Sequence, residues 1–376
     1  MRIAIINTLP IPSGAASVNR LLSYAKGLVE IGDEVTVLSS ATNKEQPKGG
    51  INGVQYVNFG RGKGLRNLLK ALVCIIKQIR KTDYDAVIVV SNSLMLLYPM
   101  AVVCRTKGIK YIQEKSEFPF VLMKKGFLRR LWASFYTSTT YKLFDGLIVM
   151  TKPLMEYFST KVRKTCKLIE VPMTVDIDRF AIAKSESSEY GNYIAYCGNM
   201  AGNKDGVMNL IEAFDMAAYR IEDVKLLLIG GSSVPEDLQR IKEFANGKGL
   251  GRILFYGLAS REEIPQLLVN ATALALARPS SLQSTGGFPT KLGEYLSTAN
   301  PVVVTAVGDI PRFLDDSNSF IVKPDNNAAF AEQIVRIFDD YATAVEVGKK
   351  GRVVAEQNFN YRVQSPRIHS FIQELL

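Results

Sequence analysis

Short apolar runs alternate with longer amphipathic segments along the whole chain, and this alternation restricts the possible folds more than any other sequence feature. Runs such as 3–6 and 302–305 are continuous, which is typical of strands covered on both faces. Windows such as 16–30 and 65–81 carry apolar residues at the helical period. This order predicts βαβ units and parallel sheets. The other strands we expect are 34–38, 86–90, 147–150, 193–196, 225–229, 253–256 and 273–277, and the other helices are 206–218, 236–246 and 291–298.

The alternating pattern occurs twice, which together with a length of 376 residues predicts two domains. A polar, aperiodic stretch at 172–190 separates the two sets of strands. We therefore expect an α/β protein with two doubly wound domains, residues 1–172 and 173–357, followed by a C-terminal segment, 358–376. Two such domains facing each other form a cleft at the carboxyl ends of their strands, where α/β sheets bind ligands.

Composition excludes several other classes of protein. Apolar residues make up 47% of the chain and charged residues 22%, which excludes a disordered or fibrous chain. The four cysteines lie far apart without a CxxC pair, and His369 is the single histidine, which argues against a disulfide scaffold, a zinc site or a Ser-His-Asp triad. The longest apolar stretch, 94–104, is about half of the ~20 residues that cross a bilayer. Residues 1–14 predict a buried first strand rather than a signal peptide.

The strongest local signal is the stretch STGGFPTKLGEYLSTANPVVVT, residues 284–305. Two glycines precede a helix whose first turn contains Pro289, so we expect the N–H groups of Gly287 and Phe288 to be free to meet an anion. Lys291 and Glu294 are three residues apart and share one face of that helix. A cation beside an anion site, with a carboxylate that accepts two ribose hydroxyls, would hold a sugar nucleotide. Alone, the two residues form an ordinary surface pair worth a few tenths of a kcal/mol.

Two further loops follow strands and carry anion-binding features. The loop 196–207 contains Gly198, Asn199 and Lys204 just before a helix, and Arg278 follows the strand 273–277. The first loop contains only Gly14 where a dinucleotide fingerprint needs three glycines, so it is either a proline-stiffened turn or a place where a phosphate approaches the backbone. Each loop alone is an ordinary turn, but three such loops at one cleft predict a diphosphate site.

At these residues the sequence resembles the family 4 retaining glycosyltransferases, which have the GT-B fold of two Rossmann-like domains. The resemblance rests on KLGEYLSTANPVVVT, on YCGN with NKDGV and LIEAF, and on VPMTVDIDRF, and it extends through most of the chain. It implies a nucleotide-sugar donor held by the second domain, an acceptor held by the first, and retention of configuration without a metal or other cofactor. It also implies that residues 358–376 cross back to pack on the first domain.

Carried over to this sequence, the resemblance places Lys204 at the donor diphosphate and Glu294 at the ribose. It places Gly287, Phe288 and Thr290 around the donor sugar and phosphate, and Gly14 where the diphosphate needs room. Asp176 and Asp178 form a D-x-D pair of the kind that holds a metal in another glycosyltransferase fold, but their place after the first domain predicts a structural role.

The sequence departs from the family pattern at three places. The first of the two family glutamates is Gly286 here, so we expect Ser284 or Thr285 to take over its contacts. An arginine common in the second-domain loop is Asn199. The first-domain region where many members have a histidine reads QEKSEFP, residues 113–119, and we expect Glu117 or Lys115 to serve there.

Positive charge is concentrated in the first half of the chain. Residues 1–180 contain 27 Lys and Arg against 13 Asp and Glu, whereas residues 181–376 contain 19 against 23. Residues 61–81 carry seven basic residues and no acidic one, and in 118–144 basic residues stand among aromatic ones. This pattern is that of a solvated basic face or of helices lying on an anionic membrane, and we favour the membrane. Nucleic acid is disfavoured because no binding module accompanies the charge.

Together these features predict a cytoplasmic glycosyltransferase bound peripherally to the inner face of the membrane. It would transfer a sugar from a nucleoside diphosphate sugar to a hydroxyl of an acceptor such as a lipid-linked glycan in surface polysaccharide synthesis. Lys204, helix N-termini and Arg278 would stabilise the departing diphosphate. Two alternatives remain open: an epimerase or hydrolase of nucleotide sugars, and a non-catalytic partner of the same fold, which Gly286 favours.

Overall fold

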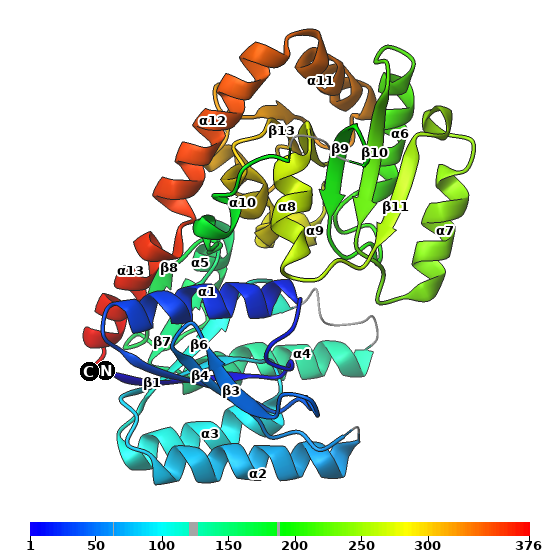
Figure 1. The fold of residues 1–376 in the computed structure, drawn as a ribbon. Coiled ribbons are helices and arrows are strands. Elements are labelled where there is room, and N and C mark those ends of the chain that lie inside the picture. Colours follow the sequence, from blue (N-terminus) through cyan, green and yellow to red (C-terminus); the bar gives the residue numbers. More distant parts are fainter. Residues whose placement is uncertain (63, 120–126, 186–188) are drawn as a thin grey trace. The chain divides into compact units, whose positions relative to one another are not determined.

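The computed structural model describes residues 1–62, 64–119, 127–185 and 189–376, which form two compact units (Figure 1). Unit 1 comprises residues 1–174 and 361–376, and unit 2 comprises residues 175–360. We expected the boundaries at 172 and 357; the chain passes between the units at 174–175 and 360–361. Each unit is a sheet with helices on both faces, as expected for doubly wound domains.

Unit 1 contains an eight-stranded sheet in the order β3-β4-β2-β1-β5-β6-β7-β8. The strands are β1 (Arg2–Asn7), β2 (Glu34–Ser39), β3 (Lys48–Ile51), β4 (Val54–Asn58), β5 (Ala86–Val90), β6 (Lys110–Lys115), β7 (Gly146–Val149) and β8 (Lys167–Glu170). The expectation of a purely parallel sheet is wrong at one edge, because β3 pairs antiparallel with β4. The residues between them, Asn52 and Gly53, both have positive φ, and Asn-Gly is the preferred sequence of a two-residue hairpin turn.

Two of the helices of unit 1 follow the amphipathic windows of the sequence, and the others were not predicted. They are α1 (Ala16–Glu30), α2 (Leu65–Lys81), α3 (Leu94–Lys107), α4 (Phe127–Thr139), α5 (Lys152–Ser159) and α13 (Tyr361–Gln373). The bounds of α1 and α2 are those predicted from periodicity. α1 and α13 pack against each other and share one core with the central strands, whereas α2 and α3 lie on the other face of the sheet (Figure 1). The C-terminal segment is therefore part of unit 1.

Unit 2 contains a six-stranded parallel sheet in the order β11-β10-β9-β12-β13-β14. Its strands are β9 (Asn192–Cys197), β10 (Val224–Ile229), β11 (Ile253–Gly257), β12 (Ala273–Leu276), β13 (Val302–Thr305) and β14 (Phe320–Val322). Its helices are α6 (Val207–Ala218), α7 (Pro235–Ala245), α8 (Glu263–Asn270), α9 (Leu282–Gly286), α10 (Thr290–Ser297), α11 (Asn327–Asp339) and α12 (Tyr341–Asn358). In the described part of the chain, no helix has both the length and the apolar character needed to cross a membrane.

A buried ion pair links α1, β6 and the segment that follows β8. The Arg20 Nε donates to Glu114 Oε1 at 2.6 Å, and both side chains are almost fully buried. The same guanidinium donates to the carbonyl of Val171 at 2.9 Å and to that of Pro172. The Tyr24 hydroxyl donates to the other oxygen of Glu114 at 2.9 Å, and burial, together with this carboxylate, raises the pKa of Tyr24.

Replacing Glu114 by alanine would leave the buried Arg20 charge without its carboxylate. We expect Glu114→Ala to lower the free energy of unfolding of unit 1 by about 3–5 kcal/mol. Glu34→Ala is the matched control because Glu34 forms an exposed pair with Arg2, and it should cost less than about 1 kcal/mol. Urea denaturation followed by circular dichroism measures both values. Equal effects of the two substitutions would contradict the structural role of the buried pair.

Candidate active site at the switch point of the second sheet

The strand order of unit 2 reverses between β9 and β12. The chain leaves β9 toward β10 on one side, while β12 lies on the other side. Loops that follow two such strands diverge, and open α/β sheets bind ligands in the crevice between them. The predicted loop with Gly198, Asn199 and Lys204 follows β9, and the predicted stretch from Arg278 to Glu294 follows β12. The fold therefore brings both predicted donor-binding stretches to the switch point.

Glycines let the backbone segments around this point approach closely. Gly206 has φ +67°, and a Cβ atom there would collide with the carbonyl oxygen of Ala277 at the end of β12. Gly230, after β10, has φ +120°, and its Cβ would collide with the carbonyl of Gly198. At Gly198 itself, a side chain would collide with the amino group of Lys291. At Gly206 and Gly230 only glycine fits, because backbone atoms already occupy the space that a Cβ atom would take.

One buried carboxylate holds the two loops together. Asp205 forms an ion pair with Lys291 Nζ, and its Oδ1 lies 3.6 Å from the Nε of Arg278. The Tyr196 hydroxyl lies 3.1 Å from Oδ2 of the same carboxylate. Burial acts to raise the pKa of Asp205, but Lys291, Arg278 and Lys204 outweigh it and hold that pKa below its ordinary value. Asp205 is therefore ionised at neutral pH, between two cations.

Arg278 lies inside the loop rather than on its surface. Its side chain is only 1% exposed, and we had expected it to face the ligand. Its Nε donates to the carbonyl of Lys204 at 3.3 Å, and another of its nitrogens donates to the carbonyl of Gly287 at 3.4 Å. Arg278 thus ties the loop after β9 to the loop after β12 and acts as a positioning residue.

Three of the other predicted residues surround this cluster. The side chain of Lys204 is exposed beside Asp205. The Lys291 ammonium lies 4.8 Å from the centre of the Tyr196 ring and keeps 13% of its side chain exposed. The Asn199 side chain accepts from the N–H groups of Ala201 and Ser233, so it shapes the loop. The exposed positive charge at the switch point therefore comes from Lys204 and the edge of Lys291.

The segment before α10 differs from the expectation in three respects. Pro289 is the N-cap residue, and the helix begins at Thr290, so Pro289 does not lie in the first turn. The Gly287 N–H is not free, because it follows the short helix α9 directly and donates to the carbonyl of Gln283 in that helix. Ser284 cannot replace the missing glutamate, because its buried hydroxyl is part of a capping box with Ser281.

The side chain of Phe288 has a structural role. It is buried, and its ring centre lies 5.7 Å from that of Phe313 and 5.3 Å from that of Phe359. The side chain therefore anchors the start of α10 in a cluster of three aromatic rings. Contacts from Phe288 to a ligand would have to come from its backbone.

Glu294 lies one turn after Lys291 on the partly buried face of α10, next to an arginine that the sequence analysis did not single out. Glu294 Oε1 lies 3.7 Å from Arg179, and Arg179 donates to the carbonyl of Arg261 at 2.6 Å. Burial raises the pKa of Glu294, and Arg179, Lys291 and Arg261 oppose this rise. Arg179 is the arginine of VPMTVDIDRF, so the motif contained it, but its distance in sequence hid the contact.

The predicted site residues of unit 1 are Gly14 and Glu117. A Cβ atom at Gly14 would meet no atom within 4 Å, so the loop after β1 is open at this point. Glu117 is partly buried just after β6, and Lys115 is buried at the end of that strand. Lys115 donates to Oδ1 of Asn92 at 2.5 Å, and burial lowers its pKa to about 8.

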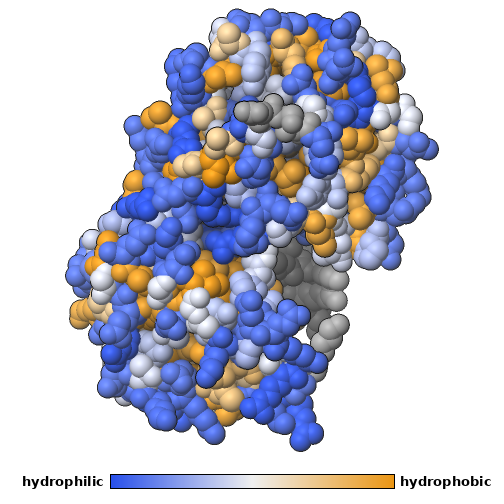
Figure 2. All heavy atoms as spheres, viewed as in Figure 1, coloured by the Kyte–Doolittle hydropathy of each residue, from blue (hydrophilic) through white to orange (hydrophobic). Residues whose placement is uncertain are grey.

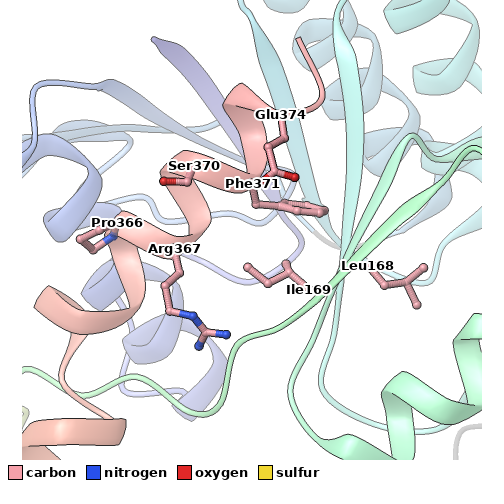
Figure 3. A pocket seen from close by; sticks show the side chains of 7 residues that line it. All are labelled: Leu168, Ile169, Pro366, Arg367, Ser370, Phe371 and Glu374. Atoms are coloured by element: carbon pink, nitrogen blue, oxygen red, sulfur yellow. The ribbon is translucent and has the colours of Figure 1, made fainter.

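A cavity of about 460 Å³ lies elsewhere in unit 1, between the edge strand β8 and α13 (Figure 3). Ile169 and Phe371 face each other across it. Arg367 donates to the carbonyl of Glu170 at 2.9 Å, and Lys167 pairs with Glu374, so intramolecular contacts already engage these charged groups. No predicted site residue lines this cavity. Within the described ranges, no group of three or more His, Cys, Asp or Glu side chains is placed to hold a metal ion.

Most of the second unit is similar to a known protein family. Residues 191–340 match the model of the family described as Glycosyl transferases group 1, and this range contains the six strands of unit 2 and the whole switch point. Residues 191–340 are therefore similar to the group 1 glycosyltransferases. A comparison with curated protein sequences found no match.

Solved structures share the fold over the whole chain. Sucrose-phosphate synthase from Thermosynechococcus elongatus has a TM-score of 0.76 and 16% identity, covering 100% of this chain and 98% of that one. Anabaena HepE in complex with UDP-glucose has a TM-score of 0.76 and 15% identity, covering 100% of both chains. WaaG, a glycosyltransferase involved in lipopolysaccharide biosynthesis, has a TM-score of 0.71 and 14% identity, covering 98% of this chain and 99% of that one. The fold of the chain is GT-B.

The contribution of Asp205 to the free energy of unfolding should depend on pH. We expect Asp205→Asn to lower the free energy of unfolding by about 3 kcal/mol, because Arg278 would then be buried without an anion. Since the pKa of Asp205 is lowered on folding, its contribution is fully present above its ordinary value of 3.8 and is lost as the pH falls below it. The difference between the wild type and Asp205→Asn should therefore be constant from pH 5 to 8 and shrink below pH 4.

Denaturation at several pH values measures this difference. Glu332→Gln is the control, since Glu332 pairs with Arg220 at the surface, and it should change stability by less than about 1 kcal/mol. A difference for Asp205→Asn that does not change down to pH 3 would show that the carboxylate charge contributes nothing.

Proposed function

We propose that the protein is a glycosyltransferase that transfers a sugar from a nucleoside diphosphate sugar to a hydroxyl group of an acceptor. The family match of residues 191–340 and the GT-B fold support the class of reaction. The solved complexes of HepE with UDP and with UDP-glucose show that a protein of this fold holds such a donor. In this chain, unit 2 would hold the donor.

One observation carries the proposal: a glycine-rich loop at the switch point with two lysines at its edge. The loop after β9 presents Lys204, and the Asp205 carboxylate fixes Lys291 beside it. Two positive charges at a crevice of this kind complement a diphosphate. Glu294 lies three residues from Lys291 on α10, and its carboxylate can accept hydrogen bonds from two ribose hydroxyls.

The reaction we propose is a displacement on one face of the sugar, with retention of configuration. The bond between the anomeric carbon and the diphosphate oxygen breaks, and its electron pair leaves with the diphosphate. The acceptor oxygen forms the new bond to the anomeric carbon from the same face, and its proton passes to the departing phosphate oxygen. Lys204 stabilises the charge that develops on the diphosphate, and Arg278 and Asp205 keep the loop in position.

The remaining parts of the proposal concern cofactor, acceptor and location. We propose that the lysines take over the charge-stabilising role, without a metal or other cofactor. The acceptor would be a lipid-linked glycan in the synthesis of a surface polysaccharide, and the basic first unit would meet the anionic inner face of the membrane. Lys115, at the end of β6, or Glu117, just after it, would line the acceptor site.

Calorimetric titration with UDP, GDP, ADP and TDP, without added metal, tests the donor site. We expect micromolar binding of one nucleotide and loss of that binding in Glu294→Ala, because the ribose hydroxyls lose their acceptor. Glu346→Ala, on the surface of α12, is the matched control and should bind as the wild type does. If none of the four nucleotides binds, the donor site is misplaced.

Turnover tests the role of Lys204. We expect Lys204→Ala to lower kcat about a hundredfold and to change nucleotide affinity less, because the charge it opposes develops in the transition state. Lys350→Ala, exposed on α12, is the control. The measurement is release of the nucleoside diphosphate from its sugar, with water as the acceptor. Unchanged turnover in Lys204→Ala would refute this role.

A non-catalytic partner protein of the same fold is the second candidate, and Gly286 favours it. The family glutamate is absent at this position, and the adjacent Ser284 hydroxyl is used within α9. This candidate would be supported if the protein binds one nucleotide but does not release that nucleoside diphosphate from any of the corresponding nucleotide sugars.

A further inference from the structure

The outward face of α2 carries an apolar stripe that no described residue of unit 1 covers. Ala71, Leu72, Ile75 and Ile79 form the buried face of this helix. Leu65, Leu69 and Val73, spaced by four residues and therefore aligned along the helix, are 62%, 44% and 49% exposed. Beside this stripe lie Arg66, Lys70 and Lys77, all of them exposed. Figure 2 shows hydrophilic and apolar side chains next to each other over α2, along the lower edge of the view.

A cavity of about 430 Å³ opens on this face. Its cations are Arg61, Arg66 and Lys70, and its apolar walls include Phe59, Leu69 and Val73. Residues 59–81 contain no acidic side chain, and among the described residues no ion pair engages these three cations. The cavity therefore combines unneutralised positive charge with an apolar wall.

We propose that this cavity binds the phosphate of an anionic phospholipid while Leu65, Leu69 and Val73 enter the interfacial layer of the bilayer. This inference rests on the membrane partner proposed above and assigns it a site. Helices with one basic and one apolar side lie in the membrane interface with the apolar side ~5–10 Å deep. Each basic residue near an anionic surface adds a similar increment of affinity.

The exposed apolar stripe favours an anionic membrane over a nucleic acid or a free phosphate ester as the ligand of this surface. A nucleic acid or a free phosphate ester would neutralise Arg61, Arg66 and Lys70 but would leave Leu65, Leu69 and Val73 in water. A bilayer containing anionic lipids satisfies both groups at once. The second basic region, 118–144, includes residues 120–126, which are not described. The side chains of 127–130 and 132 are not described either, so the inference rests on α2 alone.

Co-sedimentation of the full chain with lipid vesicles tests the inference. We expect binding to vesicles of two parts phosphatidylcholine to one part phosphatidylglycerol, and much weaker binding to phosphatidylcholine alone. Arg66→Gln with Lys70→Gln should lower this binding about twenty-five-fold, at about fivefold for each charge. Leu69→Gln with Val73→Thr should lower it about tenfold. The matched controls on α12, Lys349→Gln with Lys350→Gln and Val353→Thr, should leave it unchanged.

Three results would overturn the site. They are equal binding to the two kinds of vesicle, an equal loss in the α2 and α12 variants, and displacement from vesicles by glycerol phosphate or by short duplex DNA at the concentration of accessible anionic lipid. The α2 variants should bind nucleotide as the wild type does, which separates this inference from the donor site. A wild-type chain that binds a nucleotide but no anionic vesicles refutes the membrane site alone, and a wild-type chain that binds vesicles but none of the nucleotides refutes the donor site alone.

Discussion

The carboxylate of Asp205 joins two loops that start from strands on opposite sides of the switch point. Lys291 and Arg278 reach it from α10 and from the end of β12, and the carbonyls of Lys204 and Gly287 accept hydrogen bonds from the same arginine. Removing one partner from such a cluster leaves an uncompensated buried charge, which costs about 3–5 kcal/mol. The start of α6, the position of Lys291 and the closeness of the glycine backbones all depend on this arrangement.

The cluster also separates the positive charges of unit 2 by role. Arg278 is buried and fixes backbone, Lys291 is fixed by Asp205 but reaches the surface, and Lys204 is exposed. One turn further along α10, Arg179 holds Glu294. The short helix α10 thus carries a cation, Lys291, and a carboxylate, Glu294, and each is fixed by a partner from another segment. Side chains fixed in this way are preorganised, as a binding site requires.

Much of the fold could be predicted from the sequence, because buried parallel strands and amphipathic helices have distinct periods. All nine expected strands form, and α1 and α2 have the expected bounds. The strands β3, β4, β6, β8 and β14 were not among those expected. The hairpin of β3 and β4 was missed although Asn52-Gly53 is a recognised hairpin signal, because β3 itself is short and has only one apolar residue. The short helix α9 was also missed, since its five residues are too few to show a period.

The chemistry of the site could be predicted only in part. The glycines, the lysines and Glu294 were proposed from their residue types and spacing, and the structure brings the loops that carry them to the switch point of the second sheet. The buried position of Arg278 was not found, because its partner Lys204 is distant in sequence and only the folded backbone brings it near. The capping role of Ser284 and the hydrogen bond of the Gly287 N–H were not found, because both belong to α9, which is too short to show a period. The exposed stripe of α2 is a similar case: the period predicted the helix, and the structure shows which apolar residues remain uncovered.

A crystal structure of the full chain with its nucleoside diphosphate bound would test the donor site directly. We expect phosphate oxygens within hydrogen-bond distance of Lys204 and of the loop after β9, with Asp205 still paired to Arg278 and Lys291. A diphosphate bound away from this switch point, or an Asp205 that has released Arg278, would show that the site is wrongly assigned.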